Sequence, residues 1–361
     1  MRRTGCLQEW RRWRMRAVAA FRRCASSLFT AFPDTGTMFG KRSVMLLLGA
    51  FAIAVHGPTA LAQSFPSKPL TLVVGFAAGG GVDINARLLG SWLAEQLGQP
   101  VIIENRPGAG SRIANEHVAK AAPDGHTLLI TTAAVAIDMA IYEKLRVDTL
   151  RDFTPVSTIS STPMILVVNP SVPVKDVREL IARARAMPGT LNYSSSGSGT
   201  TGHLYGELFK LRTGTDIVHI PYKGTAPSLT ALIAGEVDVS FATVPAVLQY
   251  VRAGRLRPLA LTGEKRSELM PEVPTMKEAG VGGAVANVWY GVLAPAATPP
   301  DVVNIVAHAV MDASHSPAFR KRLVDLGAEP AATTPAEFGR LLSEEVAKWA
   351  EIVKAAGIRA D

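Results

Sequence analysis

Two loops of small residues have the composition of backbone anion sites. The first, GFAAGGGVD, spans 75–83, between the apolar run LTLVV and a segment with helical periodicity. The second, SSGSGTTG, spans 195–202, between the strand-like TLNYS and the helix-like HLYGELFKLRTG. The first N–H groups of a helix have no partner within it and carry partial positive charge, so such loops can bind a carboxylate or phosphate without Lys or Arg.

Nucleotide binding and covalent catalysis fit these loops poorly. GGGVDI has Ile84 where G-x-G-x-x-G needs its third glycine, and no G-x-x-x-x-G-K-[ST] occurs. The serines at 194–196, with His203 and His219 nearby, leave an exported serine hydrolase as an alternative. Their order, S-x-G-x-G, differs from the G-x-S-x-G elbow that exposes a catalytic serine. We therefore predict that these hydroxyls bind a ligand or cap the next helix, and that the protein is not an enzyme.

The histidines and cysteines form no metal-binding motif. The seven histidines are scattered and none belongs to H-E-x-x-H, while both cysteines, Cys6 and Cys24, lie in a region that we expect to be removed. We predict neither a metal nor a cofactor, and we interpret the two histidines near the serines as structural.

The elements that carry the loops alternate between strand-like and helix-like segments. The β-branched run 70–76 predicts a strand covered on both faces, and 83–98 has the apolar periodicity of a helix that ends at Gly98. Further strands are expected at 101–105, 126–133, 163–170, 190–194 and 286–296, and helices at 111–118, 176–186, 203–214 and 335–356. Strands separated by helices pair in parallel in a doubly wound α/β sheet. Trp289 and Tyr290 either line a cleft or fill the core between domains, and the sequence leaves both readings open.

The N-terminal region has the pattern of an export signal. Lys41 and Arg42 precede the twelve-residue apolar run VMLLLGAFAIAV, and Ala60-Leu61-Ala62 is a small-x-small cleavage site. This run is shorter than the roughly 20 apolar residues of a spanning helix. We therefore predict a signal peptide that begins at Met38 and is cleaved near Ala62, which places the mature protein in the periplasm.

The basic charge of the chain lies in this leader, residues 1–62. It contains ten Lys or Arg residues and two acidic residues, whereas the remaining 299 residues contain 28 of each kind. A mature chain without net charge has no broad attraction to phosphate backbones, so we predict no nucleic-acid partner. We interpret residues 1–37 as the product of a start codon assigned too far upstream, with an organelle transit peptide as the alternative.

The chain resembles the extracytoplasmic solute-binding receptors of the tripartite tricarboxylate transporter class, also called the Bordetella uptake gene product family. The resemblance covers essentially all of residues 64–361, and its most specific stretches are FPSKPLTLVVGFAAGGGVDINARLL, GQPVIIENRPGAG, LNYSSSGSGTTGHLYGELF, VHIPYKGTAPSLTALIAGEVDVSF and WYGVLAPAATP. It implies a type II periplasmic-binding-protein fold, in which two doubly wound α/β lobes are joined by two crossovers and enclose a ligand cleft. Residues 63–164 and 287–361 would form lobe one, and residues 165–286 would form lobe two.

The resemblance also implies the function. The ligand would be a small organic carboxylate held by backbone amides, and the partner a two-component membrane permease, or else a sensor protein. We expect a monomer that closes by hinge motion near 162–166 and 286–290.

Matching motifs imply ligand-binding residues in both lobes. In lobe one they are Phe76, Ala78, Gly79, Gly80, Asp83, Thr131, Thr132 and Ala133. In lobe two they are Ser195, Ser196, Gly199, Thr200, Tyr222, Ala242 and Thr243. Asp83 either contacts the ligand or caps the helix. Many relatives carry an aspartate where this chain has Ala242, so we expect a plain or aromatic carboxylate in preference to an amino acid.

Overall fold

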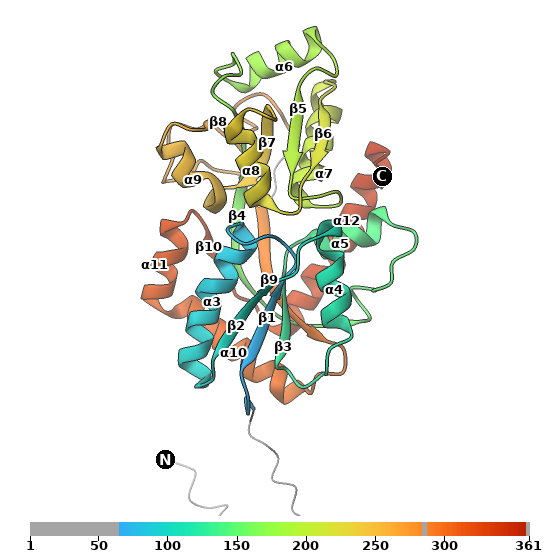
Figure 1. Ribbon diagram of the computed structural model, residues 1–361, viewed down its shortest axis with the longest axis vertical. Coiled ribbons are helices and arrows are strands. Elements are labelled where there is room, and N and C mark those ends of the chain that lie inside the picture. Colours follow the sequence, from blue (N-terminus) through green and yellow to red (C-terminus); the bar gives the residue numbers. More distant parts are fainter. Residues whose placement is uncertain (1–64, 284–286, 359–361) are drawn as a thin grey trace, which may run out of the picture. The chain divides into compact units, whose positions relative to one another are not determined.

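The computed structural model describes residues 65–283 and 287–358, apart from the side chains of residues 355 and 356 (Figure 1). The predicted signal peptide, its cleavage site and Ala286 of the second expected hinge lie outside the described residues. Among the helices that are described, none is long and apolar enough to cross a membrane.

The first group of strands forms a sheet around β1 (Leu70–Val74). This strand pairs in parallel with β2 (Val101–Asn105) and β3 (Thr127–Thr131), as the alternation of strands and helices predicts. Beyond β3 the sheet continues through the antiparallel β9 (Asn287–Pro295) to β4 (Phe153–Val168). The short β10 (Glu329–Pro330) pairs with β4.

The second group of strands repeats this arrangement around β5 (Asn192–Ser195). Here β5 pairs in parallel with β6 (Val218–Pro221) and β7 (Val239–Thr243). The far end of β4 pairs antiparallel with β7 and with β8 (Arg257–Leu261). Two α/β sheets of like order, β2-β1-β3-β9-β4 and β6-β5-β7-β4-β8, confirm the predicted two-lobed fold class.

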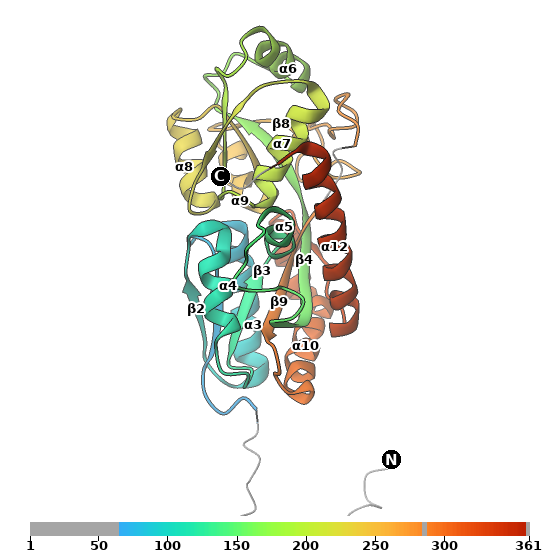
Figure 2. The ribbon, with the colours of Figure 1, turned by 90° about the vertical axis from the view of Figure 1, so that its right-hand side faces the viewer.

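The strand β4 passes from one sheet to the other, and Figure 2 shows it spanning both with β9 beside it. Residues up to Pro163 pair with β9, and residues from Met164 pair with β7 and β8. The sequence pattern predicted a strand only over 163–170, so its expected start was wrong by ten residues. The missed half is rich in hydroxyls, which find partners far along the chain: Ser157 Oγ donates to Thr333 O (2.8 Å) and Thr162 Oγ1 to Gly327 O (2.8 Å).

Helices cover the sheets of both lobes. The first sheet carries α3 (Gly81–Leu97), α4 (Arg112–Ala119), α5 (Ala134–Ile141), α10 (Pro300–His315) and α11 (Pro317–Asp325). The second carries α6 (Val177–Ala186), α7 (Thr201–Thr213), α8 (Thr225–Ala234) and α9 (Val244–Arg252). The last helix, α12 (Pro335–Ala356), contacts α5 and β4 and also reaches α7, as Figure 2 shows. A C-terminal helix therefore bridges the two lobes.

Local signals fix several helix ends as predicted. The helix α3 ends at Gly98, which is left-handed at φ 67°, a conformation that glycine adopts without a steric penalty. The carboxylate of Asp176 accepts a hydrogen bond from Glu179 N at the start of α6. These ends, together with the tight turns after the strands, place several helix N-termini at the same edge of the two sheets.

Candidate functional site

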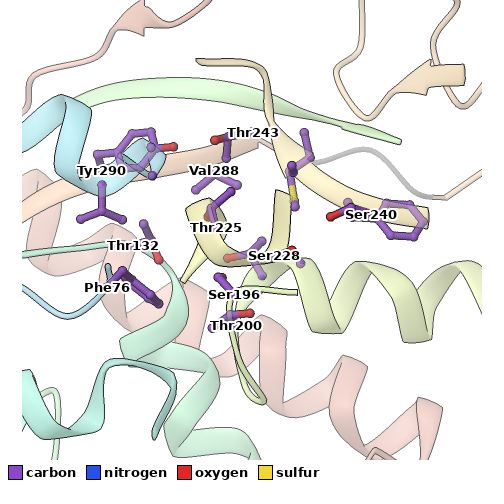
Figure 3. A pocket seen from close by; sticks show the side chains of 18 residues that line it. Phe76, Thr132, Ser196, Thr200, Thr225, Ser228, Ser240, Thr243, Val288 and Tyr290 are labelled. Carbon is purple, nitrogen blue, oxygen red and sulfur yellow. The ribbon is translucent and has the colours of Figure 1, made fainter. Parts of the chain in front are cut away.

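A small cavity lies where the two lobes meet, at the N-terminal ends of four helices (Figure 3). Its volume is about 50 Å³, and none of its 18 lining residues carries a charge. The lining includes Gly81, Thr201 and Thr225, the first residues of α3, α7 and α8, and Thr243, the residue that precedes α9.

The N-termini of these four helices are not capped by side chains. The capping positions are Gly80, Thr200, Gly224 and Thr243, and none accepts a side-chain hydrogen bond from the first turn. The first-turn N–H groups thus have no capping side chain, and the partial positive charges of the four helices converge on one small space. An anion is the species that such an arrangement stabilises.

The first loop is held in place by Asp83, which is buried and does not line the cavity. Its carboxylate accepts hydrogen bonds from Gly79 N (2.9 Å), Arg87 Nε (2.8 Å) and Asn105 Nδ2 (3.0 Å). Burial by itself would raise the pKa of Asp83, but hydrogen bonds from these three groups lower it below its usual value. Asp83 is therefore an ionised anchor that ties the turn before α3 to β2.

The second loop is held by two histidines whose rings stack with centroids 4.1 Å apart. His219 Nε2 lies 2.7 Å from Ser195 Oγ, and Gly199 N donates to His203 Nδ1 (3.3 Å). Burial, and then the neighbouring His203 and Lys210, lower the pKa of His219 to about 3, so its ring is neutral near pH 7. Ser195 is buried and does not line the cavity, so its hydroxyl supports the loop from behind.

A buried carboxyl, Asp138 of α5, lies against the same loop. A Cβ added to Gly199 would be 3.1 Å from Asp138 Oδ1, which itself is 4.0 Å from Arg112 Nη1. Burial raises the pKa of Asp138 to about 8, although Arg112 opposes this rise. The carboxyl is therefore mostly protonated near pH 7, so it adds little negative charge next to the second loop.

Loops of lobe one touch lobe two directly. Ala77 N donates to Lys223 O (3.2 Å), and a Cβ on Gly224 would be 2.8 Å from Ala77 N. At a second contact between the lobes, a Cβ on Gly110 would be 2.5 Å from Ser198 O. Glycines at both contacts allow backbone to approach backbone, so the lobes are closed over the cavity.

Tyr290 and Trp289, which the sequence left unassigned, have different places. Tyr290 lines the cavity, and Figure 3 shows it on the same side as Thr243. The ring of Trp289 packs edge-on against Phe338 of α12, with centroids 5.2 Å apart. Because alternate residues of a strand face opposite sides of its sheet, adjacent aromatic residues divide between cavity and core.

Of the fifteen residues named from the sequence, seven line the cavity. They are Phe76, Gly80, Thr132, Ser196, Thr200, Ala242 and Thr243. The other eight do not line it: Ala78, Gly79, Asp83, Thr131, Ala133, Ser195, Gly199 and Tyr222. Most of these eight lie next in sequence to a lining residue or, like Asp83 and Ser195, anchor a loop.

Eleven further residues line the cavity: Gly81, Val82, Met164, Thr201, Gly202, Thr225, Ser228, Ser240, Phe241, Val288 and Tyr290. Thr225 and Ser228 could have been found from the sequence, because KGTAPS repeats the pattern of a strand, a glycine and a helix start. Met164 and Val288 could not, because they belong to strands that cross between lobes. Among the described residues, no cluster of His, Cys, Asp and Glu side chains could hold a metal ion.

Comparison with known proteins identifies a family. A family model described as the tripartite tricarboxylate transporter family receptor matches residues 85–358. The chain is 36% identical to the protein BugT of Bordetella pertussis over 320 residues, which cover 88% of this chain and 98% of BugT.

Solved structures agree with this match. An R. palustris protein with adipate is 39% identical, with a TM-score of 0.80 over 82% of this chain and 99% of that one. MatC from Rhodopseudomonas palustris with bound malate is 34% identical, with a TM-score of 0.76 over 80% of this chain and 100% of MatC. Two further solved relatives are periplasmic, one a binding protein and one a transporter.

Proposed function

The chain belongs to the tripartite tricarboxylate transporter receptor family, and on this premise we propose that it is a solute-binding receptor for a small organic carboxylate. The two lobes close around the anion, and the closed form delivers it to a membrane transporter. Delivery of the ligand requires only binding and release, and no covalent chemistry. Solved relatives with adipate and malate support a carboxylate as the ligand class.

One observation carries this proposal: four helix N-termini without side-chain caps face a cavity that contains no charged side chain. A neutral or cationic ligand would gain little from such an array, whereas a carboxylate accepts hydrogen bonds from the free N–H groups.

We also propose boundaries for the two lobes, a cellular location and a membrane partner for the protein. We take residues 63–164 with 287–361 as lobe one and 165–286 as lobe two, because β4 changes its pairing partner after Pro163. The signal-peptide pattern at Met38 to Ala62 and the periplasmic relatives support an exported, periplasmic protein, which we take to be a monomer. Its membrane partner is the two-component permease of the tripartite system.

The proposal can be tested by measuring the thermal shift that each of a panel of ligands produces. The protein is produced from the full-length gene and recovered in its exported form. Partial unfolding and refolding then remove retained ligand. The panel contains dicarboxylates, citrate, aromatic acids, acidic amino acids, phosphate and nucleotides. A ligand at about 100 times its Kd adds about 2.7 kcal/mol to the free energy of unfolding, which raises Tm by a few degrees. We expect a shift with a carboxylate and none with nucleotides. A folded protein that responds to no carboxylate would contradict the proposal.

A further inference from the structure

We propose that Asp138 couples closure of the lobes to the uptake of one proton from solvent, so that mild acid favours the closed form. The inference rests on the proposed function, because closure is the step that retains the ligand, and it adds a regulation that carboxylate binding alone does not require. Asp138 belongs to α5, which Figures 1 and 2 both show at the end of lobe one that faces lobe two.

The carboxyl of Asp138 is buried at a contact between the lobes. Its side chain is 4% exposed, and a Cβ on Gly199 of lobe two would lie 3.1 Å from Asp138 Oδ1 and 3.5 Å from the ring of Tyr142. Gly199 belongs to the second small-residue loop, and the next two residues, Thr200 and Thr201, line the cavity. Opening of the lobes would draw this loop away from α5 and admit water to the carboxyl.

The closed form gives the carboxyl no hydrogen bond that would stabilise its charge. Within the described part of the chain, neither oxygen of Asp138 has a hydrogen-bond partner. Arg112 Nη1 is 4.0 Å from Asp138 Oδ1, too far for a hydrogen bond, and its guanidinium lies 3.7 Å from the centre of the Tyr142 ring. A carboxylate that loses its water without a hydrogen bond is costly, and the neutral acid costs less. The closed form therefore holds the acid, and a hydrated open form holds the carboxylate.

The groups around Asp138 come from both lobes. Burial raises the pKa of Asp138 to about 8, and Arg112 opposes the rise. From lobe two, His203 lies behind the second loop and accepts a hydrogen bond from its backbone at Nδ1 (3.3 Å). In lobe one, Tyr142 directly follows α5, and the adjacent turn Ala109–Ser111 carries no charged side chain. The helix α12 also packs against α5, but none of its charged side chains contributes to the shift in the pKa of Asp138.

The difference between the two forms sets the direction of the pH effect. A hydrated carboxyl has the ordinary aspartate pKa of 3.8, and the pKa in the closed form is about 8, so closure takes up a proton between these two pH values. Below this window both forms hold the proton, and above it neither does. Ligand binding includes the free energy of closure, so Kd should rise with pH within the window, by up to about 10-fold per pH unit.

The test counts the protons taken up on binding. The exported protein is titrated calorimetrically with malate, adipate, glutamate and benzoate from pH 6.5 to 8.5, in pairs of buffers that differ in ionisation enthalpy. These carboxylates stay ionised in that range, so any uptake belongs to the protein. The variants are Asp138→Asn, which has the size of the neutral acid, and Arg112→Gln. Asp325→Asn, at an exposed carboxylate of α11, is the matched control.

We expect wild type to take up about one proton per bound carboxylate at pH 7, and its Kd to rise about 10-fold from pH 6.5 to 7.5. Asp138→Asn should take up none, and its Kd should be independent of pH and lower than that of wild type at pH 7.5. Arg112→Gln should extend the uptake to higher pH, because Arg112 lowers the pKa of Asp138. Asp325→Asn should match wild type.

The possible failures are distinguishable. Binding by wild type without proton uptake overturns the inference and leaves the proposed function intact. Uptake that Asp138→Asn retains overturns the assignment to Asp138 and points to His203. If Asp138→Asn does not fold, an Arg112→Gln profile identical to that of wild type overturns the assignment instead. Binding of no carboxylate at any pH by the folded wild type overturns both the inference and the proposed function.

Discussion

Residues behind the cavity decide how its loops are held. Asp83 anchors the first loop as an ionised carboxylate, and His219 supports the second as a neutral imidazole beside Ser195. Neither side chain lines the cavity. The ligand-facing surface therefore stays uncharged while charged and polar groups one layer away fix the backbone.

The neutral His219 predicts a dependence of stability on pH. Its pKa is lowered from 6.5 to about 3 on folding, so the unfolded chain binds a proton that the folded chain excludes. The resulting stability is fully present above pH 6.5 and is lost as pH falls from there towards 3. We expect the free energy of unfolding, from urea titrations at several pH values, to fall less steeply over pH 6.5 to 4.5 in His219→Asn than in wild type.

A matched variant separates this effect from the loss of any histidine. His308 lies exposed on α10, and His308→Asn should retain the wild-type pH profile. If the free energy of unfolding falls with pH equally steeply in wild type and in His219→Asn, the buried ring is not the cause of the pH dependence.

At the scale of elements, loops of both lobes meet through glycines. Gly110, in the turn before α4, faces Ser198 O, and Gly224, before α8, faces Ala77. A side chain at either place would hold the backbones apart. The glycines of these loops thus serve two purposes, because some free the helix N-termini for an anion and others let the lobes close.

Gly110→Ala should impair closure. Its Cβ would lie 2.5 Å from Ser198 O, a backbone atom that cannot turn away, so the closed form is destabilised relative to the open form. We expect the Kd of the carboxylate found in the panel to rise about 10-fold or more, which corresponds to about 1.4 kcal/mol, when measured by titration calorimetry.

Gly98→Ala is the control for backbone strain. Gly98 has φ 67° and Gly110 has φ 64°, so alanine meets a similar left-handed penalty at both, but nothing lies within 4 Å of a Cβ at Gly98. Both variants should lose similar Tm, and only Gly110→Ala should lose affinity. Equal Kd values in the two variants would count against the closure argument.

At the scale of the whole molecule, the crossing strands couple the lobes to the site. The strands β4 and β9 run between the two sheets, and each supplies the cavity with residues: Met164 from β4, and Val288 and Tyr290 from β9. Relative motion of the lobes would therefore move the cavity lining itself. In such a receptor, the ligand stabilises the closed form by contacts that only that form offers.

Export of the protein would remove the signal peptide, so it predicts where the mature chain begins. The small-x-small pattern at Ala60-Leu61-Ala62 predicts that the protein recovered from the periplasm begins at Gln63. Intact mass spectrometry of that fraction checks this. Leu47→Arg, which places a charge within the apolar run, should abolish the periplasmic form, and a mature chain that still contains residues 38–62 would refute the assignment.

The sequence by itself determined most of the elements and the chemistry class that we propose for the site. Its strand and helix periods predicted parallel pairing around β1 and β5, and the small-residue loops predicted helix N-termini directed at an anion. These features are local, because they depend on residues adjacent in the chain and on backbone groups common to every residue.

Only the tertiary structure decided which side chains face the cavity. It separated Tyr290 from Trp289, turned Asp83 and Ser195 into anchors, and added Met164 and Val288 from the crossing strands. It also extended β4 back to Phe153, where hydroxyls meet partners in the C-terminal segment. These outcomes depend on contacts between residues of different elements or on the face that a strand presents, which local periodicity does not encode.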